Sequence, residues 1–116
     1  FIYYIYPLVN MRLYHNPRCS KSRQAFALLT ERDLSFEDYR YLERGVASED
    51  LPVLLSLDDL IRQNELDSSK NYDLENKAEV KQLIMANPKA LQRPILIVDG
   101  SAVIGRPPEK ILQLLK

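Results

Sequence analysis

The sequence predicts an α/β fold, a mixed four-stranded sheet with an inserted helical block, and three observations support this prediction. A short alternating segment, MRLY, precedes apolar residues at helical spacing, which indicates a strand followed by a helix. Near the end of the chain, the runs ILIV and AVI flank Asp99-Gly100, a turn signal typical of β-hairpins. The long segment between these regions shows mainly helical patterns.

The first part of the chain predicts a strand, a helix and a second strand. Asn16-Pro17 is a turn signal after the first strand, and the apolar residues of AFALL have the spacing of one helix face. An alternating segment rich in aromatic residues follows, and Gly45 ends it. The expected elements are a strand at 11–14, a helix at 20–31 and a strand at 35–41.

The middle of the chain predicts short helices. Ser48 is a suitable N-cap, and Pro52 would then lie in the first turn, where proline is tolerated. A further short helix is expected at 57–64, and another at 75–87 that Pro88 ends.

The end of the chain predicts a hairpin and a closing helix at 107–116, with strands at 95–98 and 102–104. This order, with a cysteine at the first strand-to-helix turn, is the arrangement of the thioredoxin fold. In that fold the X-Pro bond before the third strand is cis and faces the active cysteine. We therefore expect a cis bond between Arg93 and Pro94.

Composition excludes several classes of protein. A chain of 116 residues suits one domain, and sixteen Lys and Arg balanced by sixteen Asp and Glu predict no broad attraction to nucleic acid or a membrane. No apolar run is long enough to span a bilayer. A single cysteine cannot form an internal disulfide, which fits a reducing compartment, so we expect a cytoplasmic protein.

The first ten residues, FIYYIYPLVN, differ from the rest of the chain. They hold three of the seven tyrosines and no charge, and Met11 follows them. We interpret residues 1–10 as a tag or upstream remnant and residues 11–116 as the domain. The alternative is a signal peptide, but the segment has no positive n-region and no small-residue cleavage site.

The segment YHNPRCSKSRQAF, residues 14–26, holds the only cysteine and the only histidine. Cys19 is predicted near a helix N-terminus, where unpaired N–H groups and the helix dipole favour the thiolate. Such settings lower a cysteine pKa from about 8.5 to about 3.5–7.5, and we expect Arg18, Lys21 and Arg23 to add positive charge. The same donors would hold a tetrahedral oxyanion. The alternative is a small buried hydrophobe, but the polar neighbours suit a loop better than a core.

His15 has two interpretations. It is either a general base or a residue that packs at a strand end and tunes the pKa of the cysteine. We favour the second, because a thiolate that is already stabilised needs no base. One Cys and one His are too few ligands for a zinc site. A protein-tyrosine-phosphatase loop is excluded as well, because Ala25 stands six residues after Cys19, where that loop has arginine.

Three further arginines, Arg62, Arg93 and Arg106, are candidate anion ligands. Each alone would be read as surface charge. Arg93 and Arg106, however, bracket the predicted hairpin, and in this fold those ends lie beside the first strand-to-helix turn. Guanidinium groups bind oxyanions in bidentate fashion, so three of them around a thiolate would form a pocket for a trianion.

Three segments resemble the glutaredoxin-coupled arsenate reductase family (ArsC-like), most closely its short bacterial branch. They are HNPRCSKSR at 15–23, RPILIVDG at 93–100 and IGRPPEKIL at 104–112. The resemblance extends from Met11 to Lys116. It implies a thioredoxin-like fold with an inserted helical block and the reduction of arsenate to arsenite.

The resemblance also implies roles for single residues and partners. Cys19 matches the nucleophile that attacks arsenate, and His15 matches the histidine that lowers its pKa. The residues that match the oxyanion-binding arginines are Arg62, Arg93 and Arg106. In the family, glutathione attacks the arsenate adduct, arsenite leaves, and glutaredoxin reduces the mixed disulfide. We therefore expect glutathione as co-substrate and no tightly bound cofactor.

The single thiol supports an external reductant, because Cys19 cannot resolve its own adduct and must undergo thiol–disulfide exchange with another molecule. Two other functions stay open. One is a monothiol oxidoreductase that acts on glutathione mixed disulfides. The other is a regulator that binds RNA polymerase, although the Cys-x-x-Cys of the related regulators is missing, since Ser22 stands three residues after Cys19.

Overall fold

The computed structural model describes residues 11–115, so the predicted remnant at 1–10 lies outside the described residues. A four-stranded mixed sheet has the strand order β2-β1-β3-β4, with β1 and β2 parallel and the other pairs antiparallel. The strands are β1 (Met11–Tyr14), β2 (Glu37–Tyr39), β3 (Ile95–Val98) and β4 (Ser101–Ile104). The predicted fold class, a thioredoxin-like α/β fold with a mixed four-stranded sheet, is confirmed.

One row of the sheet determines which loops meet. Tyr14 pairs with Tyr39 on one side and with Ile95 on the other, and Ile95 pairs with Ile104. Strands β1, β2 and β4 therefore end at this edge, and β3 begins there. As a result, the chain after β1, after β2, before β3 and after β4 comes together at a single edge.

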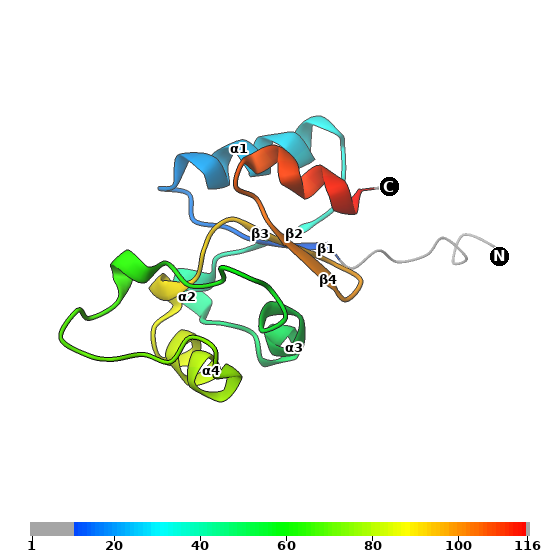
Figure 1. The fold of residues 1–116 in the computed structure, drawn as a ribbon. Helices are drawn as coiled ribbons and strands as arrows, with labels where there is room; N and C mark the ends of the chain where they lie inside the picture. Colours follow the sequence, from blue (N-terminus) through cyan, green and yellow to red (C-terminus); the bar gives the residue numbers. More distant parts are fainter. Residues whose placement is uncertain (1–10, 116) are drawn as a thin grey trace.

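Helices cover both faces of the sheet (Figure 1). The helix α1 (Ser20–Glu31) and the C-terminal 3₁₀ segment η5 (Pro108–Leu114) lie on one face. The inserted block between β2 and β3 covers the other face. Its helices are α2 (Tyr41–Arg44), α3 (Leu51–Leu54) and α4 (Lys77–Ala86), and its 3₁₀ segments are η2 (Ser48–Asp50), η3 (Gln63–Glu65) and η4 (Pro88–Ala90).

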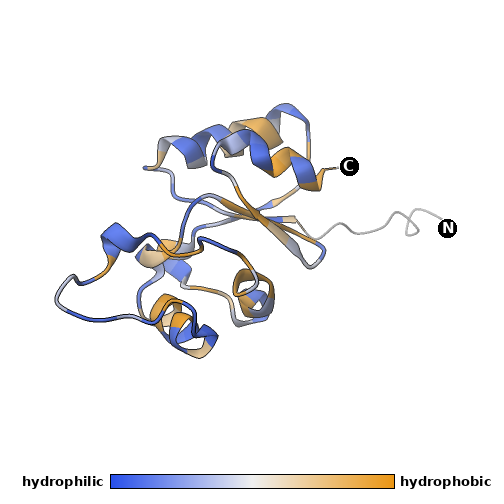
Figure 2. Cartoon of the chain, viewed as in Figure 1, coloured by the Kyte–Doolittle hydropathy of each residue, from blue (hydrophilic) through white to orange (hydrophobic). Residues whose placement is uncertain are grey.

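Each face has its own hydrophobic core, because side chains alternate along each strand. Leu13 and Leu96 pack with Leu29 and Ile111 under α1 and η5. Neighbouring strand residues point the other way and pack against the inserted block, as Tyr14 does. Figure 2 shows hydrophobic residues along the strands and on the helix sides that face them.

Several local features follow from the sequence as predicted. The helix α1 has the predicted bounds, and Asp99 and Gly100 have the positive φ angles, 47° and 82°, of a tight hairpin turn. The helix predicted at 75–87 is present as α4, but it begins later, after Asn76, whose side chain accepts hydrogen bonds from the amides of Ala78 and Glu79. The Arg93-Pro94 bond is cis, as expected.

The prediction of a helix at 57–64 is wrong. This segment forms turns and a β-bridge between Ile61 and Leu91, followed by η3. Leu60 and Ile61 are buried against the core of the inserted block, and a short apolar run of this kind suits a bridge as well as a helix. The second strand is also shorter than predicted, since Tyr41 begins α2, and the closing helix is the 3₁₀ segment η5.

Gly105 follows β4 and packs directly on the proline that precedes β3. Its amide donates a hydrogen bond to the Pro94 carbonyl over 2.8 Å. A Cβ at Gly105 would lie 2.9 Å from Pro94 Cγ and 3.0 Å from Ile111 Cγ2. Since these distances are too short for carbon atoms, the glycine permits the close approach of the loops at this edge.

We predict that Gly105→Ala lowers the free energy of unfolding by about 1–3 kcal/mol, the usual cost of overpacking a core. Urea denaturation followed by circular dichroism would measure this change. Gly100→Asn is the control, because asparagine tolerates a positive φ and nothing lies within 4 Å of the added Cβ. Equal midpoints for Gly105→Ala and the unsubstituted protein would show that this packing does not constrain the edge.

Candidate active site

Cys19 lies at the N-cap position of α1, in a turn closed by Asn16. The Cys19 backbone is extended, with φ −94° and ψ 124°, and its side chain is partly exposed. The Cys19 amide donates to the Asn16 carbonyl over 2.9 Å. The Arg18 amide donates to the Asn16 side-chain oxygen over 3.0 Å. The turn therefore presents the thiol where the first amides of α1 have no partner within the helix.

The surroundings lower the pKa of the Cys19 thiol. Burial opposes ionisation, but the backbone amides of Ser22 and Lys21 and the guanidinium of Arg93 together outweigh burial. The thiol makes no capping hydrogen bond of regular geometry, so the amides act on it mainly as fixed positive dipoles. Cys19 is therefore favoured as a thiolate, the nucleophilic form.

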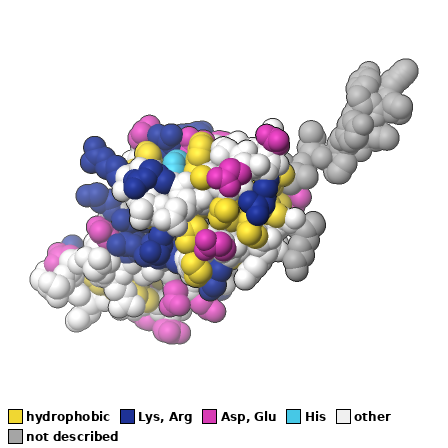
Figure 3. Space-filling model, turned by 90° about the horizontal axis from the view of Figure 1, so that it is seen from above, with side chains coloured by type: hydrophobic (Ala, Val, Ile, Leu, Met, Phe, Trp, Pro, Cys, Tyr) yellow, Lys and Arg dark blue, Asp and Glu magenta, His cyan; other side chains and the backbone are white. Residues whose placement is uncertain are grey.

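Two of the residues expected to favour the thiolate act on it in different ways. Lys21 acts through its backbone amide and Arg93 through its side chain. The Arg23 side chain instead donates to the Pro17 carbonyl over 2.9 Å. Figure 3 shows Lys and Arg side chains gathered near the histidine, at the end of the molecule where α1 begins.

His15 is buried, with 4% of its surface exposed. Its Nδ1 lies 2.6 Å from Ser22 Oγ, which also accepts a hydrogen bond from the Asn16 amide over 2.9 Å. The ring stacks on Phe26 at 4.9 Å between centroids. Burial lowers the pKa of His15, with nearby charges of both signs as smaller causes. A neutral histidine that binds Ser22 holds the turn in place, which favours the supporting role over the general base.

Arg93 and Arg106 lie at the same edge but make different contacts. The Arg93 side chain lies close enough to the Cys19 thiol to favour the thiolate. Arg106 Nη1 donates to the Arg93 carbonyl over 3.0 Å. Arg106 thus fixes the backbone that carries Arg93.

Arg62 reaches this edge through the β-bridge of the inserted block. The Arg62 amide donates to the Ala90 carbonyl over 2.7 Å, and the Gln92 amide donates to the Leu60 carbonyl over 2.8 Å. These bonds hold Arg62 beside the segment that leads into Arg93. In the described part of the chain, the Nε atoms of Arg62 and Arg93 are buried and have no hydrogen-bond partner.

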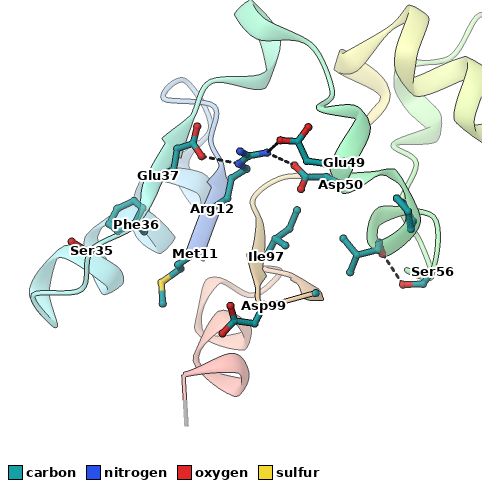
Figure 4. Close-up of a pocket in the computed structure, with 13 residues that line it drawn as sticks. Met11, Arg12, Ser35, Phe36, Glu37, Glu49, Asp50, Ser56, Ile97 and Asp99 are labelled. Carbon is teal, nitrogen blue, oxygen red and sulfur yellow. Dashed lines mark hydrogen bonds and ion pairs between the residues drawn. The ribbon is translucent and has the colours of Figure 1, made fainter. Parts of the chain in front are cut away.

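A large hollow lies elsewhere, beside β1, β2 and α3. Its volume is about 1040 Å³, and Figure 4 shows Arg12 at its wall between acidic side chains. Arg12 Nε lies 2.8 Å from Glu37 Oε1, and Arg12 Nη1 lies 2.7 Å from Asp50 Oδ2. Since the guanidinium of Arg12 is already paired, this hollow offers an anion little, despite its size.

Comparisons with known proteins identify the family of this chain. The model of the ArsC family matches residues 14–114. The chain belongs to the ArsC family. It is 37% identical to the arsenate reductase of Haemophilus influenzae, over 89% of this chain and 97% of that protein. It is 38% identical to the uncharacterized protein YfgD of Escherichia coli, over 90% of this chain and 96% of that protein.

A solved structure, the arsenate reductase from Vibrio cholerae, has a TM-score of 0.73 and 30% identity, covering 93% of this chain and 99% of that chain. A more distant match is the regulatory protein MgsR of Bacillus subtilis, at 27% identity over 91% of this chain and 90% of that protein. Family membership alone therefore does not assign an activity.

Among residues 11–115 of this ArsC-family protein, no group of three or more His, Cys, Asp and Glu could hold a metal ion. No helix within the same range is long and apolar enough to cross a membrane. The single cysteine, Cys19, stands in this range as a free thiol.

The sequence analysis missed two polar side chains of the site. Ser22 is fully buried between the histidine and the turn, and its place one helical turn after Cys19 could have indicated this. Tyr41 is also fully buried, and its hydroxyl has no partner among the described residues. The sequence predicts Tyr41 only as the last residue of a strand at 35–41, and no pattern in the sequence shows where its hydroxyl lies.

We predict that Arg93→Ala moves the pH profile of Cys19 alkylation by iodoacetamide to higher pH, because the thiolate loses its charged partner. Lys21→Ala is the matched control, since it removes a charge two residues from Cys19 and keeps the backbone amide. Its profile should coincide with that of the unsubstituted protein. Coinciding profiles for Arg93→Ala and the unsubstituted protein would rule out the role of Arg93.

The lowered pKa of His15 predicts how stability depends on pH. The unfolded chain takes up a proton below about pH 6.5, whereas the folded protein resists it, so stability falls with pH in that range. We expect the urea midpoint to fall between about pH 7.5 and about pH 5.5.

His15→Gln should remove most of this fall, because the chain has no other histidine. Both measurements belong in a Cys19→Ser background, since a thiolate with a lowered pKa also makes stability fall as pH falls. Equal slopes with and without His15 would contradict the assignment of a buried neutral imidazole.

Proposed function

We propose that this protein reduces arsenate to arsenite through the Cys19 thiolate, with glutathione and glutaredoxin as external reductants. The observation that supports this most is the convergence of a favoured thiolate with buried, unpaired guanidinium nitrogens at one edge of the sheet. A nucleophile and an oxyanion cradle at the same point suit an attack on a tetrahedral anion. The named arsenate reductases among its relatives add to this support.

The proposed reaction has three steps. The Cys19 sulfur bonds to arsenic, and one arsenate oxygen leaves as water. Glutathione then attacks the Cys19 sulfur, the sulfur–arsenic bond breaks, and its electron pair stays on arsenic, which leaves as arsenite. Glutaredoxin takes the glutathionyl group from the mixed disulfide and restores the Cys19 thiol.

Each site residue has a part in this scheme. Cys19 is the nucleophile, and His15 supports the turn that presents it. Arg62 and Arg93 bind the oxyanion and neutralise its charge. Arg106 binds the oxyanion beside them and also holds the Arg93 backbone. Glutathione is a co-substrate here, and the scheme needs no tightly bound cofactor.

A second candidate is a regulator that binds RNA polymerase, and the likeness to MgsR, a regulatory protein, supports a regulatory role. A regulator of this kind would use a surface of the domain and would not need Cys19 as a nucleophile. A third candidate, a monothiol oxidoreductase for glutathione mixed disulfides, uses the same thiolate without arsenate.

We predict arsenate-dependent oxidation of NADPH when the protein is coupled to glutathione, glutaredoxin and glutathione reductase. Cys19→Ser should reduce the rate to that of the coupling system alone, because a serine hydroxyl is rarely ionised at neutral pH and cannot form a disulfide. Equal rates for the two proteins would discard the catalytic role of Cys19.

The same assay separates the other candidates. Turnover of a small glutathione mixed disulfide without arsenate would identify the monothiol oxidoreductase. Capture of RNA polymerase to the same extent by the unsubstituted protein and by Cys19→Ser, with no arsenate turnover, would identify the regulator.

A further inference from the structure

Three tyrosines of the described region are buried around the end of β1, and they differ in what their hydroxyls bind. The Tyr14 hydroxyl donates to Asp50 Oδ2 over 2.6 Å. The Tyr39 hydroxyl donates to the Gly45 carbonyl over 2.7 Å. The Tyr41 side chain is fully buried, yet within residues 11–115 its hydroxyl has no hydrogen-bond partner. An unpaired buried hydroxyl is costly, so it calls for an explanation.

The position of Tyr41 supplies an explanation for its unpaired hydroxyl. Tyr41 is the second residue after β2, at the sheet edge where the chain after β1 carries Cys19 and the chain before β3 carries Arg93. The charges of Arg93, Cys19 and Arg62 all act on the phenol. The orphan hydroxyl therefore belongs to the same cluster as the thiolate and the two arginines.

The Tyr41 hydroxyl keeps its proton at neutral pH. Burial raises the pKa of Tyr41 to about 12, although Arg93 and Arg62 oppose the shift. The Asn16 side chain also lowers the pKa, although no hydrogen bond of regular geometry joins it to the hydroxyl. The hydroxyl proton therefore has no acceptor among the described residues, and Tyr41 remains a hydrogen-bond donor in need of one.

Arg62 and Arg93, whose charges act on Tyr41, also carry buried donors that are unpaired in the described region. The Nε atoms of Arg62 and Arg93 are buried donors without partners among the described residues. Three unpaired donors around a thiolate require an acceptor with several lone pairs that carries negative charge. A tetrahedral oxyanion such as arsenate or phosphate has this chemistry.

We propose that Tyr41 is a further substrate-binding residue, whose hydroxyl donates a hydrogen bond to an oxygen of the oxyanion held by Arg62 and Arg93. This inference rests on the function proposed above. It adds a neutral donor to a site otherwise formed by cations and backbone amides. The hydroxyl orients the oxyanion in front of the Cys19 sulfur, while the guanidinium groups neutralise the charge of the oxyanion.

The test compares Tyr41→Phe with Tyr39→Phe, each a loss of one buried hydroxyl. The probe is arsenate, which should protect Cys19 from iodoacetamide at neutral pH. The measured quantity is the arsenate concentration that halves the alkylation rate of each variant, relative to its own rate without arsenate. Melting temperatures are recorded in parallel.

We expect Tyr41→Phe to need about tenfold more arsenate for half-protection, the effect of one lost hydrogen bond to a charged group. Its melting temperature should not fall, because no protein hydrogen bond is lost, and its alkylation profile without arsenate should stay unchanged. Tyr39→Phe should keep the half-protecting concentration and melt several degrees lower, because the Gly45 carbonyl loses its partner.

Three other outcomes would contradict the inference. If arsenate protects Tyr41→Phe as well as the unsubstituted protein, Tyr41 does not bind the oxyanion, although the proposed function survives. If the alkylation profile of Tyr41→Phe moves while half-protection stays, the hydroxyl acts on the thiolate and not on the anion. If arsenate does not protect even the unsubstituted protein, the proposed oxyanion site fails and this inference fails with it.

Discussion

The pairing of four residues in one row, Tyr39, Tyr14, Ile95 and Ile104, is the constraint on which the candidate site depends. Because three strands end and one begins at this row, four separate segments meet at one edge of the sheet. A slip of one residue in any pairing would turn the buried strand residues toward the opposite face. Register therefore positions the thiol and the guanidinium groups together, although they lie far apart in the sequence.

Hydrogen-bond satisfaction divides the polar groups at this edge into two sets. His15, Ser22 and Asn16 bind one another and the backbone of the turn, so they hold the thiol in place. By contrast, Tyr41 and Nε of Arg62 and of Arg93 are buried without partners in the described region. Unpaired buried donors cost stability, and such costs are typical of functional sites, where a ligand later supplies the acceptors.

Local sequence patterns are sufficient to predict some of the secondary-structure elements. The helix from Ser20 to Glu31 and the hairpin turn at Asp99-Gly100 follow from apolar spacing and turn chemistry. The pattern of segment 57–64 is short and suits a helix as well as a bridge, so the helix that it predicts is wrong. The conformation depends on the non-local bridge from Ile61 to Leu91.

Sequence reasoning had a similar limit at the site. It placed Cys19 at a helix N-terminus and selected Arg93 as its neighbour, because motif and topology agree there. It also expected charge from Arg18, Lys21 and Arg23, which are close in sequence, whereas Lys21 acts on the sulfur through its backbone amide and the Arg23 side chain donates to the Pro17 carbonyl. The orphan hydroxyl of Tyr41 was beyond its reach, since a missing partner is a property of three-dimensional packing.

A crystal structure of the protein with arsenate tests the central claim most directly. We predict a tetrahedral oxyanion beside Cys19, with oxygens at about 2.7–3.2 Å, normal hydrogen-bond distances, from Nε of Arg62, Nε of Arg93 and the Tyr41 hydroxyl. Arsenate bound at another cluster of arginines, with these three donors paired to protein groups or still unpaired, would contradict the account.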